Sequence, residues 1–354
     1  HYPLRRQRQM CIRDRYSIEH FENKFYILTN WEARNFKLMQ TPQETTELEN
    51  WSTLIAHNSD TLLNSLQVFN EHLVISQRSN ALTSLKIIHQ KTGNYHEVSF
   101  DEPVYVVYPT TNTEFNTTKL RFRYSSLTTP STIFEYDMNE RRKKILKETQ
   151  VIGGHKPSQY KTERLFAKGR DGVLIPISLV YKKELVKNNR NPLLLYAYGS
   201  YGNSTDPWFS SIRLSLLDRG FIYAIAHVRG GQEMGRKWYE DGRLFKKKNT
   251  FYDFIDCASF LSKKGYTSAP HLYAQGGSAG GLLMGAVINM APELFNGVIA
   301  AVPFVDVIST MMDESIPLTS AEFNEWGNPK NFESYKYMNS YSPYDQVRAQ
   351  DYPI

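Results

Sequence analysis

The sequence contains few cysteines and no long apolar segment. Only Cys11 and Cys257 occur among the 354 residues, too few for a disulfide framework. Cys257 lies in an apolar stretch with helical spacing, residues 254–261, where a buried structural thiol is expected. No apolar run approaches the length of about 20 residues that a membrane-spanning helix needs. These absences argue against a disulfide-stabilised secreted domain and a helical membrane protein, and they favour a cytoplasmic location.

Positive charge is concentrated at the start of the chain. The formal net charge is +6, and residues 1–15 carry five arginines against one aspartate. The remainder is close to neutral, so the composition gives little support to nucleic-acid binding. The segment HYPLRRQRQMCIRDR has no apolar periodicity, and we interpret residues 1–15 as non-native sequence from a cloning adaptor. We interpret the whole chain as a fragment, because it starts without methionine and ends at residues 351–354 without a terminating feature. This interpretation leaves the presence of a signal peptide untested.

Residues 16–157 show short alternating strands separated by polar turns. Tyr26, Val74 and Phe122 begin comparable units at intervals of 48 residues, and each unit continues with a turn and a second strand. A strand repeat of this length is typical of β-propeller blades. About three blades fit this region, which predicts the last part of a propeller. A β-sandwich is the alternative.

From residue 158 to residue 354 the pattern is typical of an α/β domain. A hairpin is predicted around residues 170–172. Apolar strands and helices then alternate, which predicts a parallel sheet covered on both faces. The strands are expected at residues 192–198, 221–228, 271–277 and 297–302, the last of them buried, with helices at 211–219, at 250–264 and after residue 278.

The motif Gly276-Gly277-Ser278-Ala279-Gly280 joins a predicted strand to a predicted helix. In a Gly-x-Ser-x-Gly turn the serine backbone is strained, and the residues two before and two after it must be small. Such a turn holds the hydroxyl at a helix N-terminus, where free N–H groups can stabilise an oxyanion. The motif therefore predicts an α/β hydrolase with Ser278 as the nucleophile of acyl transfer. The alternative is a glycine-rich turn without catalytic function.

Partners for this serine are missing downstream. An α/β hydrolase places its acid and then its histidine after the nucleophile. No histidine follows His271, and the aspartates after Ser278 do not end recognisable sheet strands. We therefore predict a C-terminally truncated, incomplete hydrolase domain, and a polypeptide without turnover because Ser278 lacks a general base.

These residues resemble the prolyl oligopeptidase family of serine peptidases, and within it the oligopeptidase B branch. The resemblance runs from about Tyr16 to Ile354. It implies a β-propeller that restricts access to a hydrolase site, short peptide substrates cleaved after arginine or lysine, and no metal or cofactor; we expect no nucleic-acid or membrane partner. Its most specific pieces are residues 198–202, 228–231, Gly242 with 246–251, 276–281, 303–307 leading into 312–319, and Glu322 with 325–329.

The resemblance also implies roles for single residues. It makes Ser278 the nucleophile, and it makes the Ala279 backbone N–H and the Tyr198 hydroxyl the two oxyanion donors. Without the family, Tyr198 is equally well explained as a core tyrosine at a strand end.

Two acidic positions are implied to bind substrate. Glu322 falls where the branch places a carboxylate for the side chain of the P1 residue, which precedes the cleaved bond, and a carboxylate can accept a bidentate guanidinium. Asp206 matches a position associated with a basic P2 residue. Asn324 and Trp208 stand where the branch often has further acids, so recognition of P1 is expected and a preference for dibasic sites is not.

Two other functions remain open at this point. One is a prolyl or acylaminoacyl peptidase of the same family. The other is an inactive protein whose propeller binds a partner.

Overall fold

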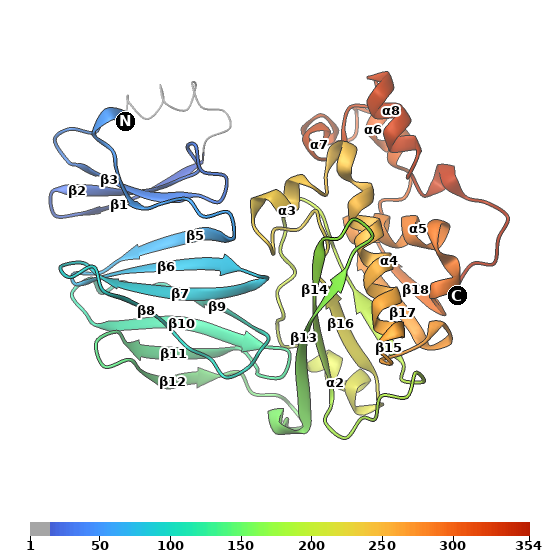
Figure 1. Ribbon diagram of the computed structural model, residues 1–354, viewed down its shortest axis with the longest axis horizontal. Helices are drawn as coiled ribbons and strands as arrows, with labels where there is room; N and C mark the ends of the chain where they lie inside the picture. Colours follow the sequence, from blue (N-terminus) through green and yellow to red (C-terminus); the bar gives the residue numbers. More distant parts are fainter. Residues whose placement is uncertain (1–14) are drawn as a thin grey trace.

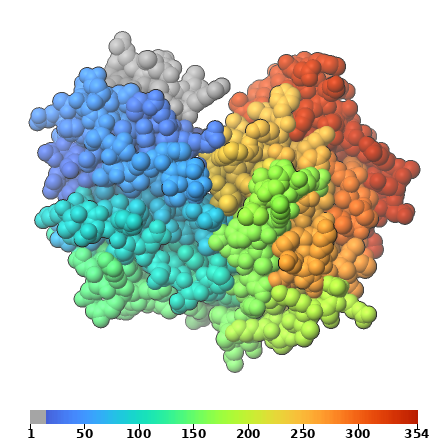
Figure 2. All heavy atoms as spheres, in the orientation of Figure 1, coloured from blue at the N-terminus to red at the C-terminus, as the bar shows by residue number. Residues whose placement is uncertain are grey.

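The computed structural model describes residues 15–354, so the predicted non-native segment, except Arg15, lies outside the described residues. The chain forms two lobes, with all-β structure in the N-terminal lobe and mixed α/β structure in the C-terminal lobe (Figure 1). In the space-filling view the two lobes are in contact along one side (Figure 2). Among the described residues, no helix combines the length and apolar character needed to cross a bilayer.

The N-terminal lobe consists of three four-stranded antiparallel sheets, which follow one another along the chain. This is the arrangement of propeller blades, and it excludes a two-sheet sandwich for this region. The first sheet contains β1 (Tyr16–Phe21), β2 (Lys24–Thr29), β3 (Lys37–Pro42) and β4 (Ser52–Ile55); the second contains β5 (Thr61–Val68), β6 (His72–Ser79), β7 (Leu82–His89) and β8 (Tyr95–Glu97); the third contains β9 (Tyr105–Pro109), β10 (Lys119–Ser126), β11 (Thr132–Asp137) and β12 (Arg142–Glu148).

The 48-residue repeat is confirmed, but each blade begins one strand earlier than predicted. Tyr26, Val74 and Phe122 all lie on the second strand of their blades, and all three are buried. The second strands lie inside their sheets, and their apolar residues pack against the neighbouring blade. Leu63 of the second blade packs in one cluster with Tyr26, and Val74 packs in another with Phe122.

The C-terminal lobe is built on a six-stranded sheet in the order β13-β14-β16-β15-β17-β18. The predicted hairpin is present as antiparallel β13 and β14, and the four strands β16, β15, β17 and β18 are parallel. The strands are β13 (Tyr160–Lys168), β14 (Leu174–Lys182), β15 (Leu193–Tyr196), β16 (Ile222–Ala226), β17 (Leu272–Gly277) and β18 (Gly297–Ala301); the helices are α2 (Ser211–Asp218), α3 (Arg236–Glu240), α4 (Lys248–Lys263), α5 (Ala279–Met290), α6 (Val307–Met312), α7 (Thr319–Trp326) and α8 (Phe332–Asn339).

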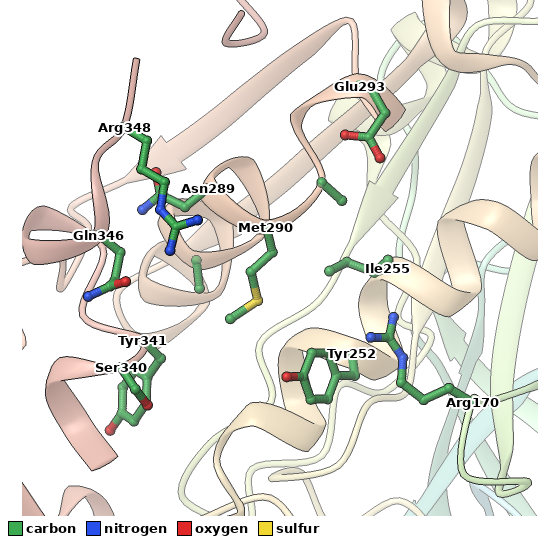
Figure 3. Close-up of a pocket in the computed structure, with 12 residues that line it drawn as sticks. Arg170, Tyr252, Ile255, Asn289, Met290, Glu293, Ser340, Tyr341, Gln346 and Arg348 are labelled. Atoms are coloured by element: carbon green, nitrogen blue, oxygen red, sulfur yellow. The ribbon is translucent and has the colours of Figure 1, made fainter. Parts of the chain in front are cut away.

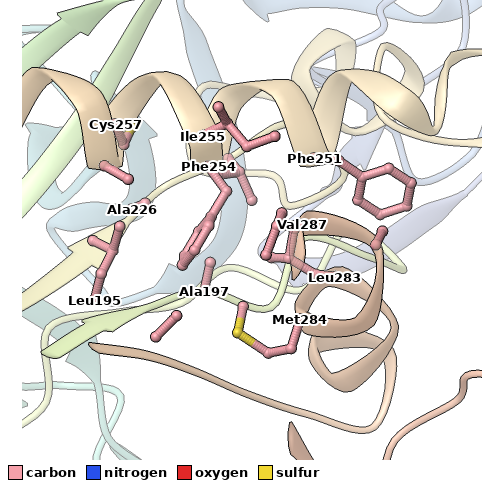
Figure 4. Packing of buried hydrophobic residues seen from close by; sticks show 14 of the residues in the cluster. Leu195, Ala197, Ala226, Phe251, Phe254, Ile255, Cys257, Leu283, Met284 and Val287 are labelled. Carbon is pink, nitrogen blue, oxygen red and sulfur yellow. The ribbon is translucent and has the colours of Figure 1, made fainter. Parts of the chain in front are cut away.

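Helices cover both faces of this sheet, as the sequence predicts. Phe254 of α4 and Leu283 of α5 pack with Leu195 of β15 on one face (Figure 4). On the other face, Leu217 of α2 packs with sheet residues such as Leu194. The Cys257 thiol is fully buried within the first of these clusters, which confirms its expected burial. The double cover holds β15 and β17 rigidly, and both strands lead into the candidate site.

The prediction of a buried strand at residues 297–302 is wrong. Gly297 is buried, but Ile299 is 53% exposed and Val302 is 85% exposed. The strand β18 lies at an edge of the described sheet, where it pairs with β17 and where the Val298 N–H donates to the Ile354 carbonyl at 2.7 Å. A continuous apolar run indicates a parallel strand, but it does not tell whether other elements cover that strand.

Buried polar contacts join the two lobes. Arg78 on β6 donates to both carboxylate oxygens of Asp206, at 2.7 and 3.0 Å, and the Tyr108 hydroxyl donates to the same carboxylate at 2.6 Å. The Ala81 N–H donates to the Glu233 carbonyl at 3.0 Å. These contacts fix the second and third blades against the loops that follow β15 and β16 of the hydrolase sheet.

Candidate active site

Ser278 lies at the sharp turn between β17 and α5. Its φ of 55° and ψ of −116° are strained for a residue with a side chain, and Ser278 is exposed. The neighbouring glycines are required sterically. A Cβ on Gly276 would lie 2.2 Å from the Gly280 carbonyl oxygen, and a Cβ on Gly280 would lie 2.8 Å from the Ala197 carbonyl oxygen. The close contacts explain the motif and hold the hydroxyl away from the sheet.

Two hydrogen-bond donors lie beside this hydroxyl. Ala279 is the first residue of α5, and no described residue accepts its N–H, as expected at a helix N-terminus. Tyr198 follows β15, and its phenol lies close enough to Ser278 for the serine side chain to affect its pKa. Burial raises the pKa of Tyr198, which keeps the phenol protonated at neutral pH. Both groups can therefore donate to a negative oxygen that forms next to Ser278.

Strained backbone also surrounds the site. Tyr201, Val302 and Leu318 have φ values of 61°, 39° and 73°. The loop that contains Val302 is held against the nucleophile turn, because the Ser278 N–H donates to the Ala301 carbonyl at 2.9 Å. Strain of this kind persists where the surrounding structure enforces it, and it is frequent at functional sites.

Glu322 is linked to Tyr198 through Tyr201. It lies on α7, where its Oε2 accepts hydrogen bonds from the Tyr201 hydroxyl at 2.7 Å and from the Trp326 indole N–H at 3.2 Å. The Tyr201 ring lies 6.5 Å from the Tyr198 ring, so Ser278, Tyr198, Tyr201 and Glu322 form a continuous row. Burial, and then the bond to Glu322, raise the pKa of Tyr201, which keeps this hydroxyl a donor. No described residue donates to Oε1, which leaves that oxygen open to a cationic ligand.

Asp206 is not part of this row. Its carboxylate is only 9% exposed and is paired with Arg78 and Tyr108 in the contact between the lobes. The Trp208 ring stacks on Tyr108 at 6.2 Å. Because Arg78 neutralises its charge within the protein, the contacts of Asp206 give no support to the predicted role in substrate binding.

Two buried charges shape the site, and sequence reasoning gave neither of them a role. The Lys247 ammonium donates to the Gly199 carbonyl at 2.6 Å, to Ser200 Oγ at 2.8 Å and to the Gly242 carbonyl at 3.2 Å. Glu325 accepts the Tyr201 N–H at 2.8 Å. Together they hold the loop that carries Tyr198 and Tyr201. One indication for both residues was present in the sequence, because Lys247 and Glu325 lie in segments that resemble the prolyl oligopeptidase family.

The described part of the chain provides Ser278 with no imidazole partner. A Ser-His-Glu cluster does occur elsewhere: His227 Nε2 is 2.7 Å from Ser178 Oγ, and His227 Nδ1 is 3.8 Å from Glu233. All three side chains are buried, so this cluster cannot meet a substrate. Residues 15–354 also contain no group of three or more histidine, cysteine or acidic side chains arranged to hold a metal ion.

A separate hollow of about 480 Å³ lies between α4, α5 and the C-terminal segment (Figure 3). Tyr252, Met290 and Arg348 line it, but neither Ser278 nor Glu322 does. It is therefore not part of the candidate site. Together, the strained serine turn, its two donors and the three blades define an α/β hydrolase that carries a β-propeller.

Comparisons with known proteins agree with this class. A model described as "Prolyl oligopeptidase family" matches residues 207–354, and one described as "Prolyl oligopeptidase, N-terminal beta-propeller domain" matches residues 9–149. The chain belongs to the prolyl oligopeptidase family.

Similar proteins include the dipeptidyl aminopeptidase BI of Pseudoxanthomonas mexicana, 46% identical over 96% of this chain and 47% of that protein. The protease 2 of Moraxella lacunata is 45% identical over 96% and 48%. The solved structure of oligopeptidase B from Leishmania major superposes with a TM-score of 0.88 at 43% identity, over 96% of this chain and 49% of that one. The chain thus spans about half the length of the curated relatives it matches.

Proposed function

We propose that this chain is part of a serine peptidase that cleaves short peptides after arginine or lysine. The proposal is supported mainly by the row of Ser278, Tyr198, Tyr201 and Glu322, which puts a strained, exposed hydroxyl and a carboxylate in one site.

In this mechanism Ser278 Oγ attacks the peptide carbonyl, while the Ala279 N–H and the Tyr198 hydroxyl donate to the oxyanion. The C–N bond then breaks, the amine leaves, and water hydrolyses the acyl ester. Attack needs a base to take the serine proton, and no described residue lies in place to do so. We therefore propose that the 354-residue chain alone has no turnover.

Glu322 provides the proposed preference for a basic P1 side chain. Both lone pairs of Oε2 are used by Tyr201 and Trp326, but the two lone pairs of the free Oε1 can accept two guanidinium N–H groups. Hydrogen bonds to charged groups contribute about 1.5–3 kcal/mol, which corresponds to about 10- to 150-fold in kcat/KM. The same pocket holds lysine through one ammonium contact.

The propeller part has a proposed selective role. We propose that residues 16–157 are blades that restrict access to the catalytic domain, residues 158–354, so that short peptides reach Ser278. The resemblance of both parts to one family supports this division. A cytoplasmic location is part of the same proposal.

The test uses a chimera in which residues 16–354 replace the matching region of the Moraxella lacunata protease 2. We expect it to hydrolyse a blocked arginyl amide, and Ser278→Ala to abolish this activity. Glu322→Gln should lower kcat/KM for the arginyl amide about 10- to 150-fold. Glu333→Gln, a matched change at an exposed glutamate on α8, should have little effect.

The remaining functions are alternative outcomes of the same assay. A chimera that prefers a prolyl or an acetylaminoacyl substrate would be a different peptidase of the family. The Pseudoxanthomonas relative suggests one further comparison, in which release of free dipeptides is measured against cleavage of blocked peptides. A folded chimera without hydrolysis of any of these substrates would support the inactive binding protein instead.

A further inference from the structure

A cavity of about 960 Å³ lies between the first two blades and the hydrolase lobe. It is bordered by the segment after β2, by β5, by α3 with its flanking loops, and by Asn324 of α7. The blue β5 and the yellow α3 lie side by side at this place in Figures 1 and 2. No proposed catalytic residue lines this cavity, and the resemblance attaches a role to one lining position only, where Asn324 stands in place of an acid.

The charged side chains that line the cavity are unbalanced. Arg34, Arg236 and Arg243 line it, together with Arg15 of the predicted non-native segment. The one acidic side chain among the lining residues, Glu240, is already 3.3 Å from Arg34. Arg236 and Arg243 form no ion pair with any acid in residues 15–354. Their hydrogen bonds go to neutral acceptors: Arg236 donates to Gln232 Oε1 at 3.1 Å, and Arg243 donates at 3.3 Å to the Asn324 carbonyl and to the Tyr239 hydroxyl.

Both guanidinium groups are held in place without a counter-ion. They stack on the Tyr239 ring, with 4.4 Å from Arg236 and 4.8 Å from Arg243 to the ring centre. The Arg236 backbone is fixed to the first blade, because its N–H donates to Asn35 Oδ1 at 2.8 Å. Each guanidinium carries five N–H donors and spends few of them within the protein, so several remain for an anionic ligand. Two fixed forks of this kind are suited to carboxylates.

The cavity is also connected to the proposed P1 pocket. The Tyr239 hydroxyl donates to Glu325 Oε2 at 2.6 Å, and Glu325 Oε1 accepts the Tyr201 N–H. The Tyr201 hydroxyl in turn donates to Glu322. Cationic and anionic subsites are thus joined by a short series of hydrogen bonds.

We propose that Arg236 and Arg243 bind a carboxylate of the same peptide whose basic side chain contacts Glu322, an inference that rests on the proposed function. The carboxylate belongs either to the C-terminus of the peptide or to an aspartate or glutamate side chain. A short peptide with a free C-terminus always has a carboxylate near its basic residue. An internal segment of a folded protein has one there only if an acidic residue happens to be nearby in its sequence.

Direct binding to the 354-residue chain tests this without catalysis. The probes are fluorescein-labelled peptides with one arginine followed by one to four glycines, made with a free C-terminal carboxylate, with a C-terminal amide, or with a final glutamate and an amide. For at least one spacing, fluorescence anisotropy at 0.15 M salt should show at least 10-fold tighter binding of a carboxylate probe than of the plain amide. The two carboxylate probes distinguish the C-terminal source from the side-chain source.

Variants separate the cavity from general charge effects. In the double variant Arg236→Gln/Arg243→Gln the preference for carboxylate should fall to within about 2-fold. The double variant Arg236→Gln/Arg243→Lys should regain part of this preference. Lys144→Gln/Lys147→Gln removes the same charge from the exposed strand β12 and should keep the full preference. Equal affinity for acid and amide in the unsubstituted chain, including no detectable binding of either, would overturn the inference, as would an equal loss in the lysine control.

Glu322→Gln separates this inference from the proposed function. It should weaken binding of all probes to a similar extent and leave the carboxylate preference. If Glu322→Gln weakens binding but no preference exists, the cavity assignment alone fails. If the preference exists but Glu322→Gln has no effect, the P1 assignment fails and the carboxylate site stands.

Discussion

Lys247 should make the stability of the hydrolase lobe depend on pH. Its ammonium is buried, and burial lowers the pKa of this group from 10.5 to about 8, with the charge of Glu325 acting in the opposite direction. The unfolded chain keeps the ordinary pKa, so between pH 8 and pH 10.5 the unfolded state binds more protons than the folded state. Stability contributed by Lys247 therefore rises with pH across this window and is constant below it.

The magnitude follows from the shift of the pKa. Lowering the pKa from 10.5 to about 8 corresponds to about 3 kcal/mol over the full window, most of which falls between pH 7 and pH 10. Tyrosines and Cys257 titrate in the same range, so the relevant quantity is the difference between the unsubstituted chain and Lys247→Met. Methionine fills a similar volume and does not titrate.

The assay is urea unfolding of both proteins at pH 7, 8, 9 and 10, followed by tryptophan fluorescence. The free energy of unfolding of the unsubstituted chain, minus that of Lys247→Met, should increase by about 2–3 kcal/mol from pH 7 to pH 10. A difference that stays constant, or that decreases as the pH rises, would refute the assignment of a buried, depressed ammonium at this position.

Two further substitutions test the geometry around the site. Gly276→Ala should destabilise the hydrolase lobe by about 3 kcal/mol in the same unfolding assay, because its Cβ would lie 2.2 Å from the Gly280 carbonyl oxygen. Gly277→Ala, where the nearest atom is 3.6 Å away, should cost less than about 1 kcal/mol, and equal effects would contradict the steric argument. Arg78→Met leaves Asp206 buried without its partner and should cost about 3–5 kcal/mol and increase proteolysis between the lobes. If Arg121→Met, at an exposed pair, has the same effect, the contact between the lobes is not specific.

The parts of the fold that follow from local patterns could be predicted. The 48-residue spacing of Tyr26, Val74 and Phe122 indicates blades because one position of a repeated unit is buried each time. The Gly-x-Ser-x-Gly turn indicates the elbow because only glycine fits at residues 276 and 280. Neither inference needs information about distant parts of the chain.

Contacts between distant segments could not be predicted. Asp206 reads as a free acid in the sequence, but Arg78 lies 128 residues away and no local pattern connects the two. The exposure of Ile299 depends on what covers the edge of the sheet, and its apolar neighbours in the sequence do not reveal this. The burial of Lys247 is similar, since a run of three lysines is normally a solvated surface.

The proposed function requires Ser278 to attack a substrate whose basic side chain is held by Glu322. The most direct measurement is labelling of the chimera with an arginine diphenyl phosphonate, which phosphonylates an activated serine, followed by peptide mass spectrometry. We expect one adduct on Ser278 and no adduct in Ser278→Ala. Labelling should be slowed at least 10-fold by Glu322→Gln and should keep its rate in Glu333→Gln. An adduct on another residue, or faster labelling by the proline analogue than by the arginine reagent, would contradict it.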